Sequence, residues 1–207
     1  MCGIAGYVAL DGHPVQEEPI VAMLDLLRHR GPDDSGTFLG PGVALGNRRL
    51  SVIDVAGGHQ PMRGDRSTTM LVLNGEIYNY RELARELEAH GDSLRTKSDT
   101  EVVARAYDRW GLDFLDRLDG MFALALWDGE ARRLVLARDR LGEKPLYYAV
   151  ADGLVIFASE LSAMLSHPAV PRELDPASLS TYLALEYLPA PASIIRGVEK
   201  LEPGSVL

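Results

Sequence analysis

The chain contains a single cysteine, Cys2, directly after Met1. Removal of Met1 would leave a thiol and a free α-amine on one residue. An α-amine with a pKa of about 7.7–8.0 can take the proton of a thiol with a pKa of about 8.5 through a bridging water, so such a residue holds its own nucleophile and base. Position alone also permits a small, buried and unreactive side chain. The other polar residues have to decide between these two interpretations.

Polar residues lie within or beside apolar or amphipathic segments at three further places. Arg49 lies within the strand-like stretch 43–54, Asn74-Gly75-Glu76 follows the apolar run 70–73, and Asp99 precedes an amphipathic segment. Each has an ordinary structural explanation as well. Asn-Gly after a strand is common in hairpin turns, and an acid at the start of a helix often serves only as a cap or first-turn charge. None of these residues identifies a function by itself.

Hydrophobic periodicity predicts the elements that must position these side chains. Strands are predicted at 4–10, 43–54, 70–73, 121–127, 134–138, 146–150 and 154–158, and helices at 19–28, 80–90, 99–110, 160–166 and 176–187. Residues 74–76 are predicted to form a special turn between a strand and a helix. Several strands are almost continuously apolar, which indicates that both of their faces are covered. We therefore expect an α+β fold of antiparallel sheets packed face to face, with helices outside.

Composition excludes several classes of function. The 207 residues carry a formal net charge of −9, which argues against a general binder of nucleic acid or of anionic membranes. No apolar run approaches the roughly 20 residues that span a bilayer. One cysteine permits no disulfide within the chain, and the five histidines show no metal-ligand spacing. We expect a cytoplasmic protein without a bound metal.

Five short motifs occur together in the chain, and their order and spacing are informative. They are Cys2-Gly3-Ile4, Arg30-Gly31-Pro32-Asp33, Arg49-Leu50-Ser51, Asn74-Gly75-Glu76-Ile77-Tyr78-Asn79 and Ser98-Asp99-Thr100-Glu101. Together they resemble the glutaminase domain of class II glutamine amidotransferases, specifically the asparagine synthetase type. Further matches at 120–123, 137–142, 144–148 and 158–160 extend the resemblance over essentially the whole chain. The resemblance implies the four-layer αββα sandwich of N-terminal nucleophile hydrolases.

The resemblance also implies a role for each matched residue. Cys2 would attack the side-chain amide of glutamine, giving a thioester and ammonia, and water would then release glutamate. The Asn74 side chain and the Gly75 backbone N–H would form the oxyanion hole. Arg49 would bind the α-carboxylate of glutamine, while Glu76, Asp99 and the Val52 carbonyl would hold its α-ammonium group. Arg30 is a weaker candidate near the same pocket.

The family pattern further implies a division of the chain and a set of partners. Residues 1–188 would form the glutaminase domain, and residues 189–207 would lead towards an ATP-dependent synthetase domain of the same polypeptide. No Ser-Gly-Gly-x-Asp-Ser type loop occurs before Leu207. We therefore expect this chain to hydrolyse L-glutamine without a cofactor. ATP and magnesium are expected to bind only in the absent synthetase domain, and that domain would make asparagine from aspartate. A homodimer is left open.

Two alternatives remain open from the sequence. A related amidotransferase would pass the ammonia to a sugar or a secondary metabolite, and the acceptor would be recognised outside this chain. A catalytically silent module would only dock a synthetase partner, and its Met1 would stay in place.

Overall fold

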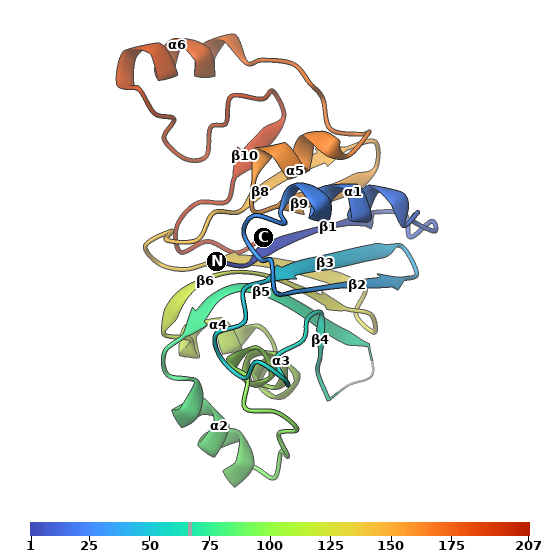
Figure 1. Cartoon of the computed structure of the whole chain (residues 1–207), viewed down its shortest axis with the longest axis vertical. Helices are drawn as coiled ribbons and strands as arrows, with labels where there is room; N and C mark the ends of the chain where they lie inside the picture. Colours follow the sequence, from blue (N-terminus) through green and yellow to red (C-terminus); the bar gives the residue numbers. More distant parts are fainter. Residues whose placement is uncertain (66–67) are drawn as a thin grey trace.

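Two antiparallel sheets form the centre of the computed structural model, which describes residues 1–65 and 68–207 (Figure 1). The first sheet has the strand order β10-β8-β9-β1-β3-β2, and the second has the order β4-β5-β6-β7. The strands of the first sheet are β1 (Gly3–Ala9), β2 (Asp34–Gly40), β3 (Val43–Arg49), β8 (Tyr147–Ala151), β9 (Leu154–Ala158) and β10 (Val198–Lys200). Those of the second are β4 (Met62–Arg63), β5 (Thr69–Ile77), β6 (Gly120–Asp128) and β7 (Arg133–Arg138).

Helices cover the outer face of each sheet. α1 (Glu18–Leu26) and α5 (Leu161–Ser166) lie on the first sheet, and α2 (Tyr80–Ala89) and α3 (Asp99–Trp110) lie on the second (Figure 1). A 3-10 turn (Gly111–Asp113) and the short α4 (Phe114–Arg117) follow α3, and α6 (Pro176–Leu185) comes late in the chain. The predicted α+β sandwich with helices outside is thereby confirmed.

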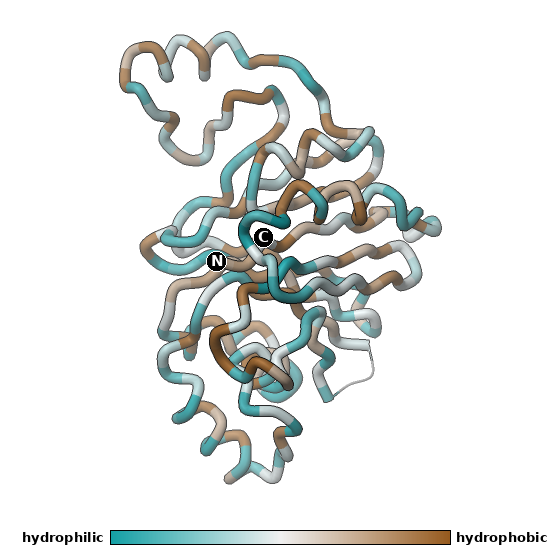
Figure 2. The backbone as a smooth tube through the Cα atoms, viewed as in Figure 1, coloured by the Kyte–Doolittle hydropathy of each residue, from teal (hydrophilic) through white to brown (hydrophobic). Residues whose placement is uncertain are grey.

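Strand β1 shows why several strands of this chain are almost continuously apolar. Its seven residues are all buried, and successive side chains point to opposite faces of the sheet. Ile4 and Val8 join the cluster between the two sheets, whereas Ala5 and Tyr7 pack under the helices. Figure 2 shows hydrophobic segments running through both sheets. A strand that is covered on both sides holds its first residues rigidly, and Cys2 directly precedes it.

The predicted turn at residues 74–76 is wrong. β5 continues to Ile77, and its residues Asn74, Gly75 and Glu76 pair with β6. The chain turns only at residues 78–79. The prediction placed the end of the strand at the last apolar residue, Leu73. The hydrogen bonds between paired strands are made by the backbone, so the pairing continues through polar residues as well.

Other boundaries also differ from the prediction. β3 ends at Arg49 instead of continuing to residue 54, and the polar strand β2 was not predicted. The start of α3 agrees with its capping signal, because the Ser98 side chain accepts a hydrogen bond from the Thr100 N–H at 3.2 Å. A helix cap depends on neighbouring residues, so its position can be predicted from the sequence. Strand pairing depends on distant residues and cannot be predicted in this way.

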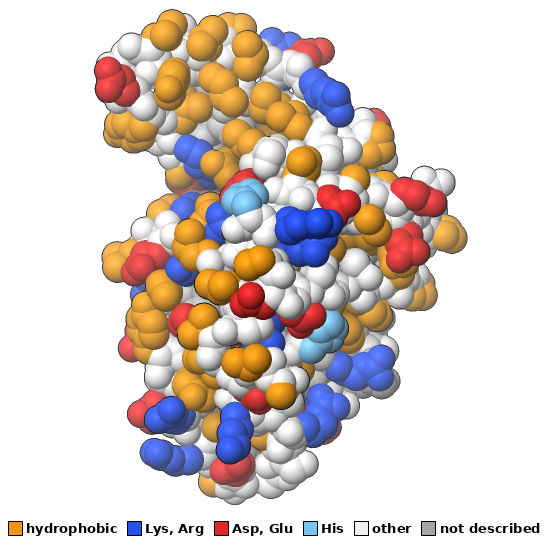
Figure 3. Space-filling model, in the orientation of Figure 1, with side chains coloured by type: hydrophobic (Ala, Val, Ile, Leu, Met, Phe, Trp, Pro, Cys, Tyr) orange, Lys and Arg blue, Asp and Glu red, His pale blue; other side chains and the backbone are white. Residues whose placement is uncertain are grey.

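Helix α6 projects away from the sandwich (Figure 1). Apolar side chains gather on the exposed surface of α6 and of the segment that follows it, including Leu183 at 73% exposure and Tyr187 at 59% (Figure 3). After it the chain returns to the first sheet as β10, and Leu207 exchanges backbone hydrogen bonds with Leu136 of 2.8 and 2.9 Å. The division at residues 188 and 189 stays a prediction. Within the described residues, no helix has the length and hydrophobicity to cross a membrane.

Phe157 lies between the sheets with 0% exposure, so its replacement tests the sandwich core. We expect Phe157→Ala to lower the free energy of unfolding by about 3–5 kcal/mol, because it removes a buried ring and leaves a cavity. Leu183→Ala, at an exposed position on α6, is the control and should change it by less than about 0.5 kcal/mol. Urea denaturation followed by circular dichroism measures both. Equal effects of the two replacements would contradict the placement of the core.

Candidate active site

Cys2 directly precedes β1, which lies between β9 and β3 in the first sheet. Its Sγ atom is 3.7 Å from the Leu50 carbonyl oxygen, to which the thiol donates. Burial raises the pKa of the Cys2 thiol, and the hydrogen bond to Leu50 and the charge of Arg49 oppose that shift without cancelling it. The thiol is therefore held protonated at neutral pH. A nucleophile in this environment needs a base beside it.

Asn74 is fully buried near the end of β5, and its amide is unusual. Neither its Oδ1 nor its Nδ2 has a hydrogen-bond partner among the described residues. An unsatisfied buried polar group costs about 1–3 kcal/mol, so its presence needs an explanation. The amide offers a donor and an acceptor to a group that enters the site.

Gly75 follows Asn74 and is forced to be a glycine by its neighbours. Its φ is +155°, and a Cβ atom there would lie 2.0 Å from the Met121 carbonyl oxygen of β6. Any side chain would therefore push β5 away from β6. The close approach fixes the backbone N–H of Gly75 relative to the Asn74 amide.

The β1 and β5 strands lie in different sheets, and Asn47 of β3 connects them. Asn47 pairs with Ile4 of β1, and its Nδ2 atom donates to the Leu73 carbonyl at 3.4 Å. Leu73 immediately precedes Asn74, and Ile4 lies two residues after Cys2. This connection brings the thiol and the Asn74–Gly75 pair to the same edge of the sandwich.

Arg49 is a buried cation at the end of β3, with 5% of its surface exposed. Its Nη2 atom donates to the carbonyls of Ile53 and Asp54 at 2.8 Å, and Nη1 donates to the Val55 carbonyl at 3.1 Å. These carbonyls belong to the loop formed by residues 50–61, which also contains the exposed Val52. The loop thus orients the guanidinium, and the hydrogen bonds described for it go to carbonyls instead of carboxylates.

Glu76 and Asp99 form an acidic pair across β5 and α3. Asp99, at 5% exposure, accepts hydrogen bonds from the N–H groups of Ile77 at 3.1 Å and Thr100 at 2.8 Å. Burial raises the pKa of Asp99. Burial and the charge of Asp99 also raise the pKa of Glu76, against the opposing charges of Lys144 and Arg49. Two neighbouring acids, one of which raises the pKa of the other, are suited to a cationic ligand.

The structure thus places the predicted residues Cys2, Arg49, Asn74, Gly75, Val52, Glu76 and Asp99 on segments that converge at one edge of the sandwich. Arg30 joins them, because its Nε atom donates to the Cys2 carbonyl at 2.8 Å. Among the described residues, no group of three or more His, Cys, Asp or Glu side chains is arranged to hold a metal ion.

Gln60 is a positioning residue that sequence reasoning missed. Its Oε1 atom accepts from the Leu73 N–H at 2.7 Å, and its Nε2 atom donates to Thr100 Oγ1 at 3.2 Å. One buried side chain therefore joins the residue before Asn74 to the residue after Asp99. The sequence carried no signal for it, because a glutamine in a loop before a proline has no distinctive pattern.

Glu101 supports the approach to α3, although its sequence position suggested only a first-turn acid. It has 0% exposure and accepts from the N–H groups of Arg95 at 3.0 Å and Thr96 at 2.6 Å. Burial would raise the pKa of Glu101, but these hydrogen bonds outweigh it and lower the pKa. The ionised carboxylate holds the segment that leads to Asp99.

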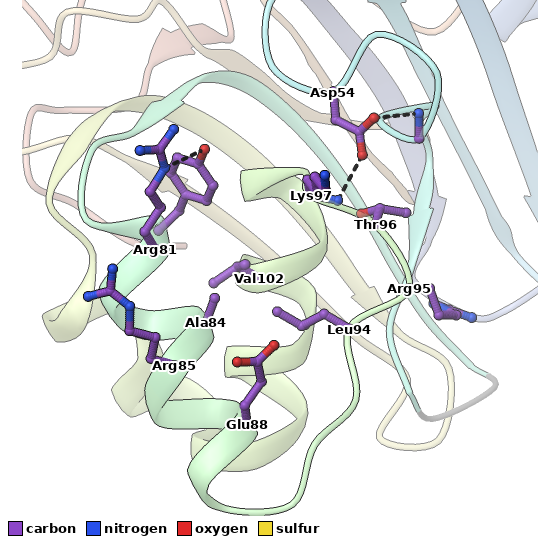
Figure 4. A pocket seen from close by; sticks show the side chains of 12 residues that line it. Asp54, Arg81, Ala84, Arg85, Glu88, Leu94, Arg95, Thr96, Lys97 and Val102 are labelled. Carbon is purple, nitrogen blue, oxygen red and sulfur yellow. Dashed lines mark hydrogen bonds between the residues drawn. The ribbon is translucent and has the colours of Figure 1, made fainter.

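A cleft of about 800 Å³ opens beside the site, between the 50–61 loop and α2 (Figure 4). Asp54 lines it and accepts hydrogen bonds from the N–H groups of Lys97 at 2.8 Å and Gly57 at 2.9 Å. Arg81 and Arg85 of α2 also line the cleft. Cys2 and Asn74 are not part of its wall, so the cleft adjoins the candidate site without containing its nucleophile.

Comparison with solved structures agrees with this architecture. Glutamine phosphoribosylpyrophosphate (PRPP) amidotransferase from B. subtilis, complexed with ADP and GMP, superposes with a TM-score of 0.68 over 84% of this chain and 46% of that chain. A second structure, described as the allosteric regulatory enzyme of purine biosynthesis, has a TM-score of 0.67 over 84% of this chain and 45% of its own. Both are 24% identical to this chain, so the likeness shows the fold alone.

Sequence comparison identifies closer relatives. Asparagine synthetase [glutamine-hydrolyzing] 3 of Bacillus subtilis is 39% identical over 213 residues, covering 100% of this chain and 34% of the relative. Asparagine synthetase [glutamine-hydrolyzing] 1 of the same organism is 41% identical, covering 99% of this chain and 33% of the relative. A putative asparagine synthetase [glutamine-hydrolyzing] of Mycobacterium tuberculosis is also 41% identical, with coverage of 99% and 34%. The chain spans about a third of the length of these curated relatives.

The family described as the glutamine amidotransferase domain matches residues 1–207. The match includes the cysteine that precedes β1, the orphaned amide of β5 and the acids at the start of α3. This chain therefore belongs to the glutamine amidotransferase domain family.

Proposed function

We propose that this chain hydrolyses L-glutamine to glutamate and ammonia, with Cys2 as the nucleophile once Met1 has been removed. The observation that carries the proposal is the buried Asn74 amide, which has no partner among the described residues and adjoins the tightly fixed backbone of Gly75. A fold retains such a group at a cost in stability when a ligand completes its hydrogen bonds. The oxyanion formed from an amide substrate is a ligand of that kind.

The reaction proceeds through a thioester. Sγ of Cys2 attacks the side-chain carbonyl carbon of glutamine while the α-amine of the same residue accepts the thiol proton, directly or through water. The proton then passes to the leaving nitrogen, the carbon–nitrogen bond breaks and ammonia departs. Water attacks the thioester with the amine as base, which releases glutamate and restores the thiol. The Asn74 Nδ2 and the Gly75 N–H stabilise the negative oxygen, each by about 2.7–4 kcal/mol.

The charges at the site complement the zwitterionic end of glutamine. Arg49 is the proposed partner of the α-carboxylate, because its guanidinium is buried and is oriented by neutral carbonyls. Glu76 and Asp99 are the proposed partners of the α-ammonium group, with the Val52 carbonyl beside them. A cation between these acids would offset the repulsion that raises the pKa of Glu76.

The fate of the ammonia is proposed from the curated relatives. They are named glutamine-hydrolyzing asparagine synthetases and are about three times as long as this chain. We propose that a synthetase portion of the same polypeptide uses the ammonia, ATP and magnesium to form asparagine from aspartate in the cytoplasm. A sugar or secondary-metabolite acceptor would be distinguished by supplying each acceptor with ATP to the longer protein.

Replacement of the nucleophile tests the glutaminase itself. We expect Cys2→Ala to reduce glutamate formation by about 10⁴-fold or more, since the covalent step is lost. Glutamate and ammonia are measured with the purified chain, and intact mass establishes that Met1 has been removed. A processed chain that is equally active with alanine at position 2 would refute the mechanism, and a processed wild-type chain without activity would favour the silent docking module.

The oxyanion role of Asn74 predicts a selective loss of rate. We expect Asn74→Ala to lower kcat by about 10²–10³-fold with little change in KM, because the donor is needed chiefly in the transition state. Asn79→Ala is the control, because Asn79 Nδ2 donates to the Arg117 carbonyl at 2.9 Å, at the turn before α2. Steady-state kinetics separates the two parameters. A rise in KM with unchanged kcat would assign Asn74 to substrate binding instead.

The acidic pair predicts a pH dependence of glutamine binding. The pKa values of Glu76 and Asp99 are raised, first by burial, so protonation begins at a higher pH than for ordinary carboxyl groups. We therefore expect affinity to fall as pH decreases through these raised values, because the charges that face the ammonium group are lost. Calorimetric titration of the inactive Cys2→Ala variant measures the affinity. Asp99→Asn should weaken binding and flatten this dependence, and an unchanged profile would contradict the assignment.

A further inference from the structure

The segment Ser159–Glu160, between β9 and α5, holds the backbone next to Cys2. Ser159 Oγ accepts from the Ile4 N–H at 3.0 Å, and the Ser159 N–H donates to the Ile4 carbonyl at 2.9 Å. Ser159 has 0% exposure. These bonds extend the pairing of β9 with β1 to Ser159. The backbone that carries the Glu160 side chain is therefore held in place close to Cys2.

Arg30 links Glu160 to the residue that carries the thiol. Its Nε atom donates to the Cys2 carbonyl at 2.8 Å, and its Nη1 atom donates to Glu160 Oε1 at 2.9 Å. The guanidinium is planar and rigid, so a carboxylate that fixes one part of it also fixes the direction of its other donors. Gly3 permits this approach, because a Cβ there would lie 3.3 Å from Arg30 Cδ.

Burial makes Arg30 dependent on its carboxylate partner. The Arg30 side chain is only 9% exposed, and its Nη2 atom has no hydrogen-bond partner among the described residues. Burial would raise the pKa of Glu160, but hydrogen bonds from Arg30 and His29 outweigh it and lower the pKa. His29 Nε2 lies 3.0 Å from the same Oε1 atom. Glu160 is therefore an ionised counter-charge, and its loss would leave a buried cation held by little besides the Cys2 carbonyl.

We infer that Glu160 is a positioning residue for the nucleophile, acting through Arg30 on the carbonyl of Cys2. The inference rests on the proposed glutaminase function. Glu160 does not touch the substrate; it keeps the thiol aligned with the oxyanion donors. A displacement of about 1 Å at a reacting group can cost about 10²-fold in rate, so this indirect contact has a measurable effect.

Kinetics of the full chain separates positioning from binding. We expect Glu160→Ala to lower kcat for glutamine hydrolysis by about 10–100-fold with KM unchanged within about twofold, because the clamp for glutamine lies on other segments. Glu160→Gln keeps an acceptor for Arg30 and should restore most of kcat. Arg30→Ala combined with Glu160→Ala should be no worse than Arg30→Ala alone, since both act along one chain of contacts.

Glu173→Ala is the matched control, because Glu173 pairs with Arg196 at 2.9 Å on the surface with 66% and 58% of the two side chains exposed. It should leave kcat and KM unchanged. A wild-type kcat in Glu160→Ala would overturn the inference. The inference would also be overturned if Glu160→Ala both raised KM and lowered the melting temperature and Glu160→Gln corrected neither change. That outcome would indicate a merely structural role.

A second readout is independent of glutaminase activity. Cys2 is the only cysteine of the chain, so the rate of alkylation by iodoacetamide reports on this thiol alone. We expect Glu160→Ala to change that rate severalfold, and Glu160→Gln and Glu173→Ala to leave it near the wild-type value. If the wild-type chain does not hydrolyse glutamine but Glu160→Ala still changes the alkylation rate, the positioning contact is supported and the proposed glutaminase function is refuted. Unchanged alkylation in Glu160→Ala would overturn the contact whatever the activity.

Discussion

The backbone ladder between β5 and β6 continues through Asn74, Gly75 and Glu76, and the other polar groups of the site are arranged around it. This extension places the Asn74 amide, the Gly75 backbone N–H and the Glu76 carboxylate on consecutive residues at the end of the strand. The rest of the structure keeps them in place. Gln60 holds the strand from one side, and Asp99 accepts from the N–H of Ile77 at its end. Fixed dipoles of this kind need no rearrangement when a charged oxygen forms, which is the physical basis of oxyanion stabilisation.

The two charged parts of the site are supported in different ways. Arg49 is surrounded by neutral carbonyls, so its charge is oriented but not neutralised by an ion pair in the described contacts. The negative charge of Asp99 raises the pKa of the partly buried Glu76, and burial raises the pKa of Asp99 itself. Both arrangements are costly in the free protein and become favourable when opposite charges arrive. A free amino acid supplies both charges at once, whereas a glutamine side chain within a peptide has neither.

The sequence predicted the class of fold and most elements, because hydrophobic patterns and caps are local. The helix that begins at Asp99 and the buried strand after Cys2 are examples. It misplaced the end of β5, since strand pairing with β6 depends on residues about fifty positions away. The candidate residues came from motif resemblance and not from periodicity. Gln60, Glu101 and Glu160 act through contacts that exist only after folding, so no local pattern revealed their positioning roles.

The tight contact at Gly75 restricts which residues the two neighbouring strands can carry there. Met121 meets position 75 through its backbone carbonyl, and a Cβ at 75 would approach that oxygen to 2.0 Å. The close contact therefore involves the backbone of β6 and residue 75 of β5. The contact involves only the backbone of residue 121, so it does not depend on the Met121 side chain, whereas any residue other than glycine at 75 would clash with that backbone. Of these two positions in neighbouring strands, residue 75 is therefore restricted to glycine by its missing Cβ atom, and residue 121 contributes only its carbonyl group to the contact.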